Sequence, residues 1–195
     1  MRAVFLDRDG VLNLDGPGFV TTPDELYLLP GAAESVAALN RAGVPVVVAT
    51  NQSCIGRGIL TEEGLDQIHA KLKREIGRVG GRLDAIYHCP HAPWEECSCR
   101  KPKPGMLLRA RDELGIDLAA SYFVGDKPTD IECGARAGCT TVLVLSGLVP
   151  EYRPDEFEVK PDRVCADLPE AVDWILRDIE NGERLRDRAA TEELS

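Results

Sequence analysis

Residues 5–12, with the sequence FLDRDGVL, decide the fold, because an apolar run ends there in two carboxylates one residue apart. Aspartate is depleted in strand interiors, so Asp7 and Asp9 mark the point where a strand opens into a loop. α/β proteins bind ligands at the carboxyl ends of parallel strands, and paired carboxylates suit Mg²⁺, which also takes phosphate oxygens. The pair indicates a metal-assisted site with one aspartate as nucleophile and the other as acid/base. The alternative for this motif alone is a solvated turn.

The composition indicates a globular protein that does not bind polyanions. The chain has 195 residues, of which 44% are hydrophobic, and this is enough for one domain with a substantial core. Its formal net charge of −10 repels nucleic acid and anionic membranes, so we expect neither as a partner. No apolar run reaches the roughly 18 residues of a membrane span, and the N-terminus lacks a signal pattern. We therefore expect a cytoplasmic protein.

Short β-branched runs alternate with helical patterns along the chain. Strands are predicted at residues 3–6, 44–49, 83–87, 122–125 and 141–145, with a short sixth strand beginning at Val164. Helices are predicted at residues 31–42, 61–79, 104–114 and 129–137, and a last helix has an apolar face of Val172, Ile175, Leu176 and Ile179. Strands separated by helices predict a parallel sheet with right-handed crossovers.

The domain organisation follows from the same alternation. Residues 1–180 are predicted to form a single α/β domain, in which the stretch 147–162 is loop. The tail at residues 181–195 is almost wholly charged or small, so we expect it to be frayed, with no function that the sequence indicates.

Two further polar segments stand next to predicted elements. Residues 50–53, Thr-Asn-Gln-Ser, follow the second strand, and a dense cationic patch at residues 100–103, Arg-Lys-Pro-Lys, precedes a helix. A hydroxyl and backbone amides at a strand end can hold a phosphate oxygen, and cations near a helix N-terminus suit a phosphate group. The alternatives are an ordinary turn and a solvated basic loop.

The fourth predicted strand also ends in an acid, Asp126, and Asp130 follows at the start of a helix. Asp126 is the better placed of the two to bind a metal, whereas Asp130 fits an N-terminal helix charge. In a parallel sheet these strand ends lie on one edge, where the following side chains would converge: Asp7, Asp9, Thr50, Lys101 and Asp126. Such a set meets the needs of phosphoryl transfer.

The cysteines predict a second metal site. Seven cysteines without a secretion signal argue against a disulfide framework. The segments Cys89-Pro90-His91 and Cys97-Ser98-Cys99 supply three thiols and one imidazole, which complete a tetrahedral Zn²⁺ shell of the structural kind. The alternative is free buried cysteines, the interpretation that we give to the remaining four: Cys54, Cys133, Cys139 and Cys165.

Together, Asp7-x-Asp9-Gly10-Val11-Leu12, Thr50, Lys101 and Gly125-Asp126-x-x-x-Asp130 resemble the four motifs of the haloacid dehalogenase (HAD) superfamily. The resemblance covers about residues 2–180. It extends to the zinc-bearing branch of D-glycero-D-manno-heptose 1,7-bisphosphate 7-phosphatases and histidinol-phosphate phosphatases. It implies a HAD-type, Rossmann-like parallel sheet flanked by helices, with no separate cap domain and a zinc-bound loop at residues 88–100.

The resemblance also implies a role for each motif residue. Asp7 would be the nucleophile that forms an aspartyl-phosphate, and Asp9 would protonate the leaving group and then activate water. Thr50 and Lys101 would stabilise the transferring phosphoryl group. Mg²⁺ would be bound by Asp7, the backbone carbonyl of Asp9 and Asp126, and Zn²⁺ by Cys89, His91, Cys97 and Cys99.

The residues that would contact substrate, by the same resemblance, lie in the loop after the first strand, after the second strand and beside two of the motifs: Asp15, Gly18, Phe19, Asn51, Gln52, Ser53, Arg57, Arg100 and Lys127. The segments 50–53 and 56–58 are similar to the heptose enzymes, whereas the short gap between His91 and Cys97 is similar to the histidinol-phosphate enzymes.

The resemblance implies a Mg²⁺-dependent phosphatase that hydrolyses the 7-phosphate of D-glycero-D-manno-heptose 1,7-bisphosphate, with histidinol phosphate as the alternative substrate. A receiver-like phosphate-binding module without turnover is the alternative from a different class. We expect a monomer whose partner is a small phosphorylated sugar.

Overall fold

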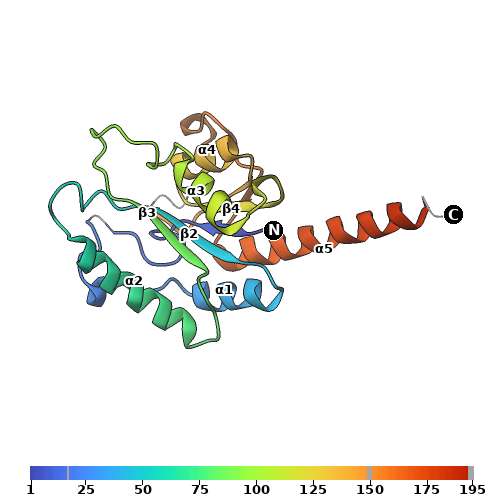
Figure 1. Ribbon diagram of the computed structural model, residues 1–195, viewed down its shortest axis with the longest axis horizontal. Helices are drawn as coiled ribbons and strands as arrows, with labels where there is room; N and C mark the ends of the chain where they lie inside the picture. Colours follow the sequence, from blue (N-terminus) through green and yellow to red (C-terminus); the bar gives the residue numbers. More distant parts are fainter. Residues whose placement is uncertain (17, 149–150, 193–195) are drawn as a thin grey trace.

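Six parallel strands form one sheet in the computed structural model, which describes residues 1–16, 18–148 and 151–192, the stretch 183–192 by its backbone alone (Figure 1). The order across the sheet is β3-β2-β1-β4-β5-β6. The predicted parallel α/β sheet is therefore confirmed. The strands span β1 Val4–Leu6, β2 Val46–Asn51, β3 Ala85–Cys89, β4 Tyr122–Gly125, β5 Thr140–Val144 and β6 Arg163–Cys165.

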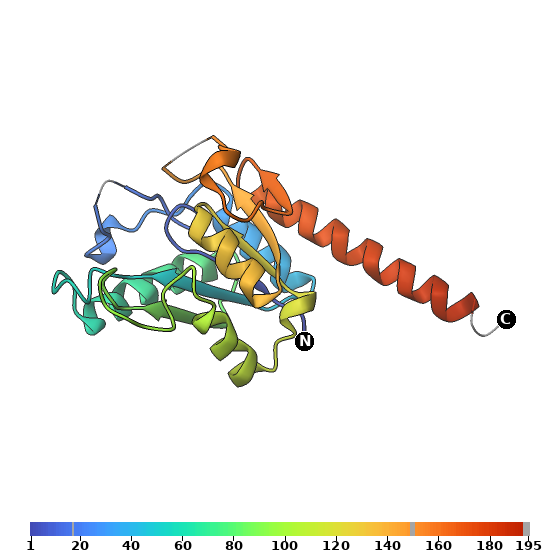
Figure 2. The ribbon, with the colours of Figure 1, turned by 90° about the horizontal axis from the view of Figure 1, so that it is seen from above.

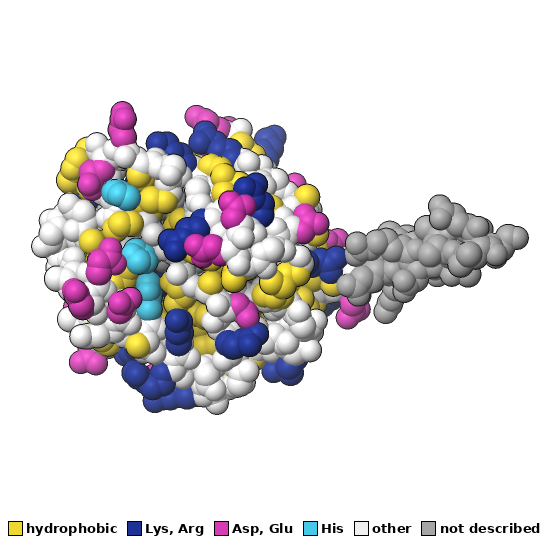
Figure 3. Space-filling model, viewed as in Figure 1, with side chains coloured by type: hydrophobic (Ala, Val, Ile, Leu, Met, Phe, Trp, Pro, Cys, Tyr) yellow, Lys and Arg dark blue, Asp and Glu magenta, His cyan; other side chains and the backbone are white. Residues whose placement is uncertain are grey.

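Helices cover both faces of the sheet. One hydrophobic core lies between the sheet and α1, α2 and α5, and a second lies between the sheet and α3 and α4 (Figures 1 and 2). The helices span α1 Ala32–Arg41, α2 Glu62–Gly77, α3 Gly105–Leu114, α4 Pro128–Ala137 and α5 Leu168–Glu192, with short 3₁₀ turns η1 Pro23–Glu25, η2 Leu118–Ala120 and η3 Pro154–Glu156. Acidic and basic side chains are intermingled on the face seen in Figure 3. Among the described residues, no helix has both the length and the apolarity needed to span a bilayer.

The central strand β1 determines where the site lies. All three of its residues are fully buried, with Val4 and Leu6 in one core and Phe5 in the other, as side-chain alternation along a strand requires. The chain runs from β1 to β2 and β3 on one side and continues with β4, β5 and β6 on the other. This reversal between β1 and β4 creates a crevice at the carboxyl ends of the two strands, where open α/β sheets bind ligands.

Two predicted strands end later than expected. β2 and β3 have the predicted lengths but lie two residues further along the chain, because Thr50 pairs with His88 and Asn51 with Cys89 in the parallel ladder. Thr50 and Asn51 are thus held in a strand, whereas Gln52 and Ser53 follow it and Ser53 lies in a turn. The predicted start of α2 is confirmed, since the Thr61 side chain accepts a hydrogen bond from the Gly64 amide.

The prediction of a frayed tail from Asn181 is wrong for the described backbone, because α5 continues as a helix through Glu192 (Figures 1 and 2). Residues 183–192 are mostly Glu, Arg, Leu and Ala, which are strong helix formers, so the helix propagates beyond its packed turns. The last part of the predicted tail, residues 193–195, lies outside the described residues.

Candidate active site

The predicted nucleophile, Asp7, lies immediately after β1, with 5% of its surface exposed. Its Oδ1 pairs with Lys101 Nζ at 2.8 Å, and the same Nζ lies 2.7 Å from Asp130 Oδ1. Burial lowers the pKa of Lys101, but the charges of Asp130 and Asp7 outweigh burial and raise it above its ordinary value. Lys101 is therefore a protonated, fixed cation beside the nucleophile.

A buried acidic cluster surrounds this lysine. Asp7, Asp126 and Asp130 have carboxylate oxygens within 4.8 Å of one another. Burial raises the pKa of Asp7 to about 6 against the opposing charge of Lys101, and burial together with the charges of Asp130 and Asp7 raises the pKa of Asp126 to about 8. The Oδ1 of Asp126 is buried and has no hydrogen-bond partner among the described residues. Such a cluster fits a divalent cation that takes hard oxygen ligands.

Two glycines allow Asp126 to enter the crevice. A Cβ at Gly10, which has a φ of +86°, would lie 2.4 Å from Asp126 Oδ2. A Cβ at Gly147 would lie 2.1 Å from the same oxygen. The loops after β1 and β5 therefore approach this carboxylate as closely as a backbone can, and a side chain at either position would displace it.

Asp9, the predicted acid/base, is held by donors on both of its oxygens. Arg8 lies 2.9 and 3.0 Å from its two oxygens, Asn13 Nδ2 lies 2.9 Å from Oδ1, and Gln52 Nε2 lies 3.0 Å from Oδ2. Burial raises the pKa of Asp9, but the Arg8 charge and the hydrogen bonds from Asn13 and Gln52 outweigh burial and lower it below its ordinary value.

The end of β2 and the residue that follows it supply the predicted threonine and two amides. Thr50 is buried, and its Oγ1 accepts a hydrogen bond from Gln52 Nε2 at 2.9 Å, so its own proton is free to be donated to a ligand. Asn51 uses both ends of its amide on the backbone of Lys101: Oδ1 accepts from the amide at 3.1 Å, and Nδ2 donates to the carbonyl at 3.2 Å. Asn51 thus fixes the loop that carries the lysine.

Two adjoining cavities open at this edge and share Asp9, Asn51 and Lys127. One, of about 480 Å³, also contacts Asp7, Thr50, Arg100 and Lys101. The other, of about 290 Å³, also contacts Asp15, Gly18, Phe19 and Gln52. The predicted substrate residues Ser53 and Arg57 line neither cavity, and Ser53 is buried.

Lys127 lines both cavities and carries a positive charge into each of them. Its Nζ bonds to Asp15 Oδ2 at 2.8 Å and lies 3.4 Å from Asp126 Oδ2. Burial lowers the pKa of Lys127, but the charges of Asp126 and Asp7 outweigh burial and raise it above its ordinary value. The protonated ammonium group can therefore bind an anion that lies in either cavity.

Arg57 brings together three loops near the cavities. Its guanidinium carbon lies 4.9 Å from the centre of the Trp94 ring and 5.9 Å from the centre of the Phe19 ring. Both aromatic rings are exposed, and Phe19 also lines the smaller cavity. Cation–π contacts of this kind join the loop after β1, the loop after β2 and the cysteine loop into one wall.

The predicted zinc ligands Cys89, His91, Cys97 and Cys99 lie together, with ligand atoms within 4.8 Å of one another. The Nδ1 of His91 lies 3.6 Å from Cys89 Sγ and 3.4 Å from Cys99 Sγ. Three thiols and an imidazole at these separations fit one tetrahedral Zn²⁺. Cys99 is followed directly by Arg100 and Lys101, so the cluster lies at the base of the lysine loop.

Sequence reasoning missed three residues of the acidic network: Arg8, Asn13 and Asp130. Arg8 and Asn13 hold Asp9, while Asp130 pairs with Lys101 and also accepts from the Lys127 amide at 3.1 Å. Only Asp130 had a signal in the sequence, because its spacing from Asp126 belongs to the motif quoted above. The other two resemble solvated polar residues until the fold is known.

Comparisons with known proteins agree with this geometry. The HAD-hydrolase-like family model matches residues 98–171. A relative from Bordetella bronchiseptica, named D-glycero-beta-D-manno-heptose-1,7-bisphosphate 7-phosphatase, is 40% identical over 178 residues, which cover 91% of this chain and 99% of the relative. A relative of the same name from Pseudomonas aeruginosa is 44% identical over 144 residues, 74% of this chain and 81% of the relative.

A solved structure gives the same result. The crystal structure of D,D-heptose 1,7-bisphosphate phosphatase from B. bronchiseptica, complexed with magnesium and phosphate, matches with a TM-score of 0.82 at 40% identity. The match covers 91% of this chain and 99% of that chain. The resemblance inferred from the motif residues is thereby confirmed, and the chain belongs to the family of HAD-like hydrolases.

Proposed function

We propose that this chain is a Mg²⁺-dependent phosphatase that removes the 7-phosphate of D-glycero-D-manno-heptose 1,7-bisphosphate. The observation that carries the proposal is the convergence of Asp7, Lys101 and Asp126 in the crevice between β1 and β4, with Asp9 beside them. The relatives named above, which this chain matches over most of their length, support the choice of substrate.

The proposed reaction has two steps at phosphorus. A carboxylate oxygen of Asp7 attacks the 7-phosphoryl group, and the bond from phosphorus to the sugar oxygen breaks. That oxygen takes a proton from the Asp9 carboxyl, which is ionised in the free protein and therefore has to take up this proton as the phosphate dianion binds. Water then gives a proton to Asp9 and attacks the aspartyl-phosphate, so the bond to Asp7 breaks and inorganic phosphate leaves. Lys101 and the free proton of Thr50 stabilise the negative charge on the phosphoryl oxygens.

The acidic cluster fits Mg²⁺, because it contains a buried carboxylate oxygen without a partner among the described residues. Asp7, Asp126 and the backbone carbonyl of Asp9 would hold the ion, which when bound neutralises charge on the phosphoryl oxygens. Asp130 is already engaged by Lys101 and by the Lys127 amide, so we assign it to holding those two residues instead.

Substrate recognition is proposed to divide between the two cavities. The larger cavity, with Asp7 and Lys101, takes the phosphoryl group that is transferred, and the smaller cavity takes the sugar. Arg100 and Lys127 line the cavities and would supply charge to a bisphosphate. We propose that Asn51 and Gln52 act mainly by holding Lys101, Thr50 and Asp9, since their amides are already bonded to those residues.

Phosphate release from candidate substrates tests the proposed activity. With Mg²⁺, the heptose 1,7-bisphosphate should be hydrolysed with a kcat/KM at least about 100-fold above that for histidinol phosphate, because only a bisphosphate can use both the reacting site and a second cationic group. Phosphorus NMR should show loss of the resonance of the phosphate at C7, with the phosphate at C1 retained. Preferred hydrolysis of histidinol phosphate would overturn the substrate assignment, and a single round of phosphorylation without release would favour a receiver.

Magnesium should stabilise the fold more at pH 8 than at pH 5.5. The pKa values of Asp7 and Asp126 are raised to about 6 and about 8, so between about pH 4 and 8 the folded chain holds protons that the unfolded chain has released. The free energy of unfolding of the metal-free protein should therefore fall as the pH rises through this range. Thermal melts at both pH values with and without Mg²⁺ would measure this, and a Mg²⁺ shift of equal size at both would contradict it.

We also propose that Cys89, His91, Cys97 and Cys99 hold a structural Zn²⁺. Metal analysis should find one zinc per chain, and Cys97→Ser should lose it, whereas Cys165→Ser, at a buried packing position, should retain it. Loss of zinc should lower both the melting temperature and kcat/KM, because the cluster anchors the segment that leads into Arg100 and Lys101. Full zinc content in Cys97→Ser, or unchanged stability after chelation, would reject this site.

A further inference from the structure

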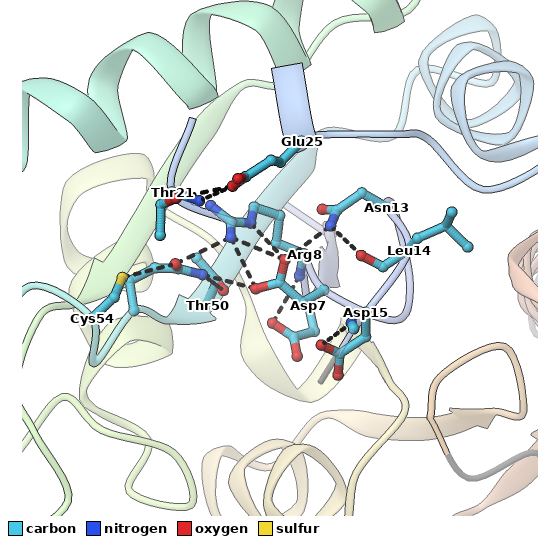
Figure 4. A network of polar contacts seen from close by, with 12 residues as sticks. Asp7, Arg8, Asn13, Leu14, Asp15, Thr21, Glu25, Thr50 and Cys54 are labelled. Carbon is cyan, nitrogen blue, oxygen red and sulfur yellow. Dashed lines mark hydrogen bonds and ion pairs between the residues drawn. The ribbon is translucent and has the colours of Figure 1, made fainter. Parts of the chain in front are cut away.

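Arg8, which separates the two aspartates of the first motif, is buried more completely than either of them, with 1% of its surface exposed. All three of its guanidinium nitrogens have partners. Nε and Nη2 donate to the Asp9 carboxylate, Nη2 also donates to Gln52 Oε1 at 3.1 Å, and Nη1 lies 3.5 Å from His69 Nε2. Figure 4 shows Arg8 between Asn13 and Thr50, with Asp7 beside it.

Burying a guanidinium is costly unless its charge and donors are matched, and an apolar side chain would fill the same space at lower cost. The partners of Arg8 come from α2, from the end of β2 and from the first motif, so distant parts of the fold cooperate to hold it. His69 is buried, and burial and the Arg8 charge lower its pKa to about 3, so it is neutral and can accept from Nη1.

The contacts of Arg8 hold the Asp9 carboxyl at the boundary between the two cavities. Asp9 is one of three residues that line both cavities. In the proposed reaction the oxygen that leaves phosphorus must lie where the phosphoryl cavity meets the sugar cavity, which is where the Asp9 carboxyl is fixed. The planar fork of Arg8 engages both oxygens of that carboxyl and so fixes its plane as well as its distance.

We propose that Arg8 is a positioning residue, supported by His69 and Gln52, that aims the Asp9 carboxyl at the leaving oxygen and then at the attacking water. This inference rests on the proposed phosphatase function. Arg8 also lines the smaller cavity, so any contact that it makes with the sugar is the same for every ester of that sugar. The effect assigned to it here is on proton transfer by Asp9, whereas attack by Asp7 and stabilisation by Lys101 proceed without it.

A pair of matched substrates separates positioning from a structural role. The first is the heptose 1,7-bisphosphate, whose sugar oxygen must take a proton as its bond to phosphorus breaks. The second has sulfur in place of that bridging oxygen, so a thiolate leaves with the bonding electron pair and needs no proton. Because the remainder of the molecule is unchanged, both esters make the same binding contacts.

Arg8→Lys keeps the charge but loses the fork. For this variant we expect kcat/KM for the oxygen ester to fall at least about 100-fold, within the range of general acid–base contributions, and that for the sulfur ester to fall less than about fivefold. The sulfur ester should also give a burst of thiol followed by slow turnover, because hydrolysis of the aspartyl-phosphate still needs Asp9 as a base. Arg109→Lys, at an exposed ion pair on α3, should leave both esters unaffected.

The ratio of the two kcat/KM values decides the outcome even if the variant is partly unfolded, since both assays use the same preparation. His69→Leu should shift the ratio in the same direction, and His69→Gln, which retains an acceptor for Nη1, should restore it. Equal losses on both esters without a burst would reject the positioning role of Arg8. Wild-type protein that is inactive on both esters would instead reject the proposed function.

Discussion

Asp7→Asn is expected to abolish phosphate release while leaving the fold intact. Asparagine has the shape of aspartate but is a much poorer nucleophile, so kcat should fall by at least about 10⁴-fold. The variant should be as stable as the wild type or more stable, because it removes one charge from a buried cluster whose members raise one another's pKa. Lys101 keeps Asp130 as its partner.

Rapid acid quenching measures this prediction directly. Wild-type protein mixed with substrate should yield a phosphorylated chain, and Asp7→Asn should yield none, with thermal melts to confirm folding. Asp66→Asn, at an exposed position on α2, is the matched control and should retain full activity. Steady phosphate release by Asp7→Asn would show that another group attacks phosphorus.

Lys101→Met is expected to have the second largest effect and, unlike Asp7→Asn, to weaken the fold as well. Methionine has a similar length and fills the buried space without charge. The loss of a preorganised cation beside the phosphoryl group should lower kcat by about 10²- to 10³-fold. Asp7, Asp126 and Asp130 would then face one another without the ammonium group, so the melting temperature should fall, most strongly above pH 6.

The stability and the activity of Lys101→Met should respond differently to added Mg²⁺. The ion can offset repulsion within the acidic cluster and restore part of the melting temperature, but it cannot replace the ammonium group at the phosphoryl oxygens. Lys73→Met, at an exposed position on α2, controls for the loss of a positive charge. A variant with full turnover would remove Lys101 from the proposed mechanism.

The sequence was sufficient to predict the sheet, because its strand and helix patterns are short, strongly alternating and bounded by Gly, Pro and cap residues. It also located the crevice, since acids after β1 and β4 identify the carboxyl ends of two strands without any coordinates. The ends of β2 and β3 were misplaced because Thr50 and Asn51 are polar yet paired in the ladder, and their pairing depends on β3.

The sequence does not reveal the residues that hold the catalytic side chains in place. The burial of Arg8 depends on His69 and Gln52, which are 61 and 44 residues away in the chain, so no local pattern distinguishes it from a solvated charge. The two hydrogen bonds between the Asn51 side chain and the Lys101 backbone span 50 residues, and no local sequence pattern reveals them. The sequence does not predict the helix through Glu192, because its charged composition is also typical of a solvated tail.

The reversal of strand order between β1 and β4 has a practical consequence. A cut in the connection between α3 and β4 would leave Asp7, Thr50 and Lys101 on one fragment and Asp126 and Asp130 on the other. Neither fragment would carry a complete set of acids. If the two were fused to separate proteins, enzymatic turnover would reappear only when those proteins met, so this fold offers a natural division for a split reporter.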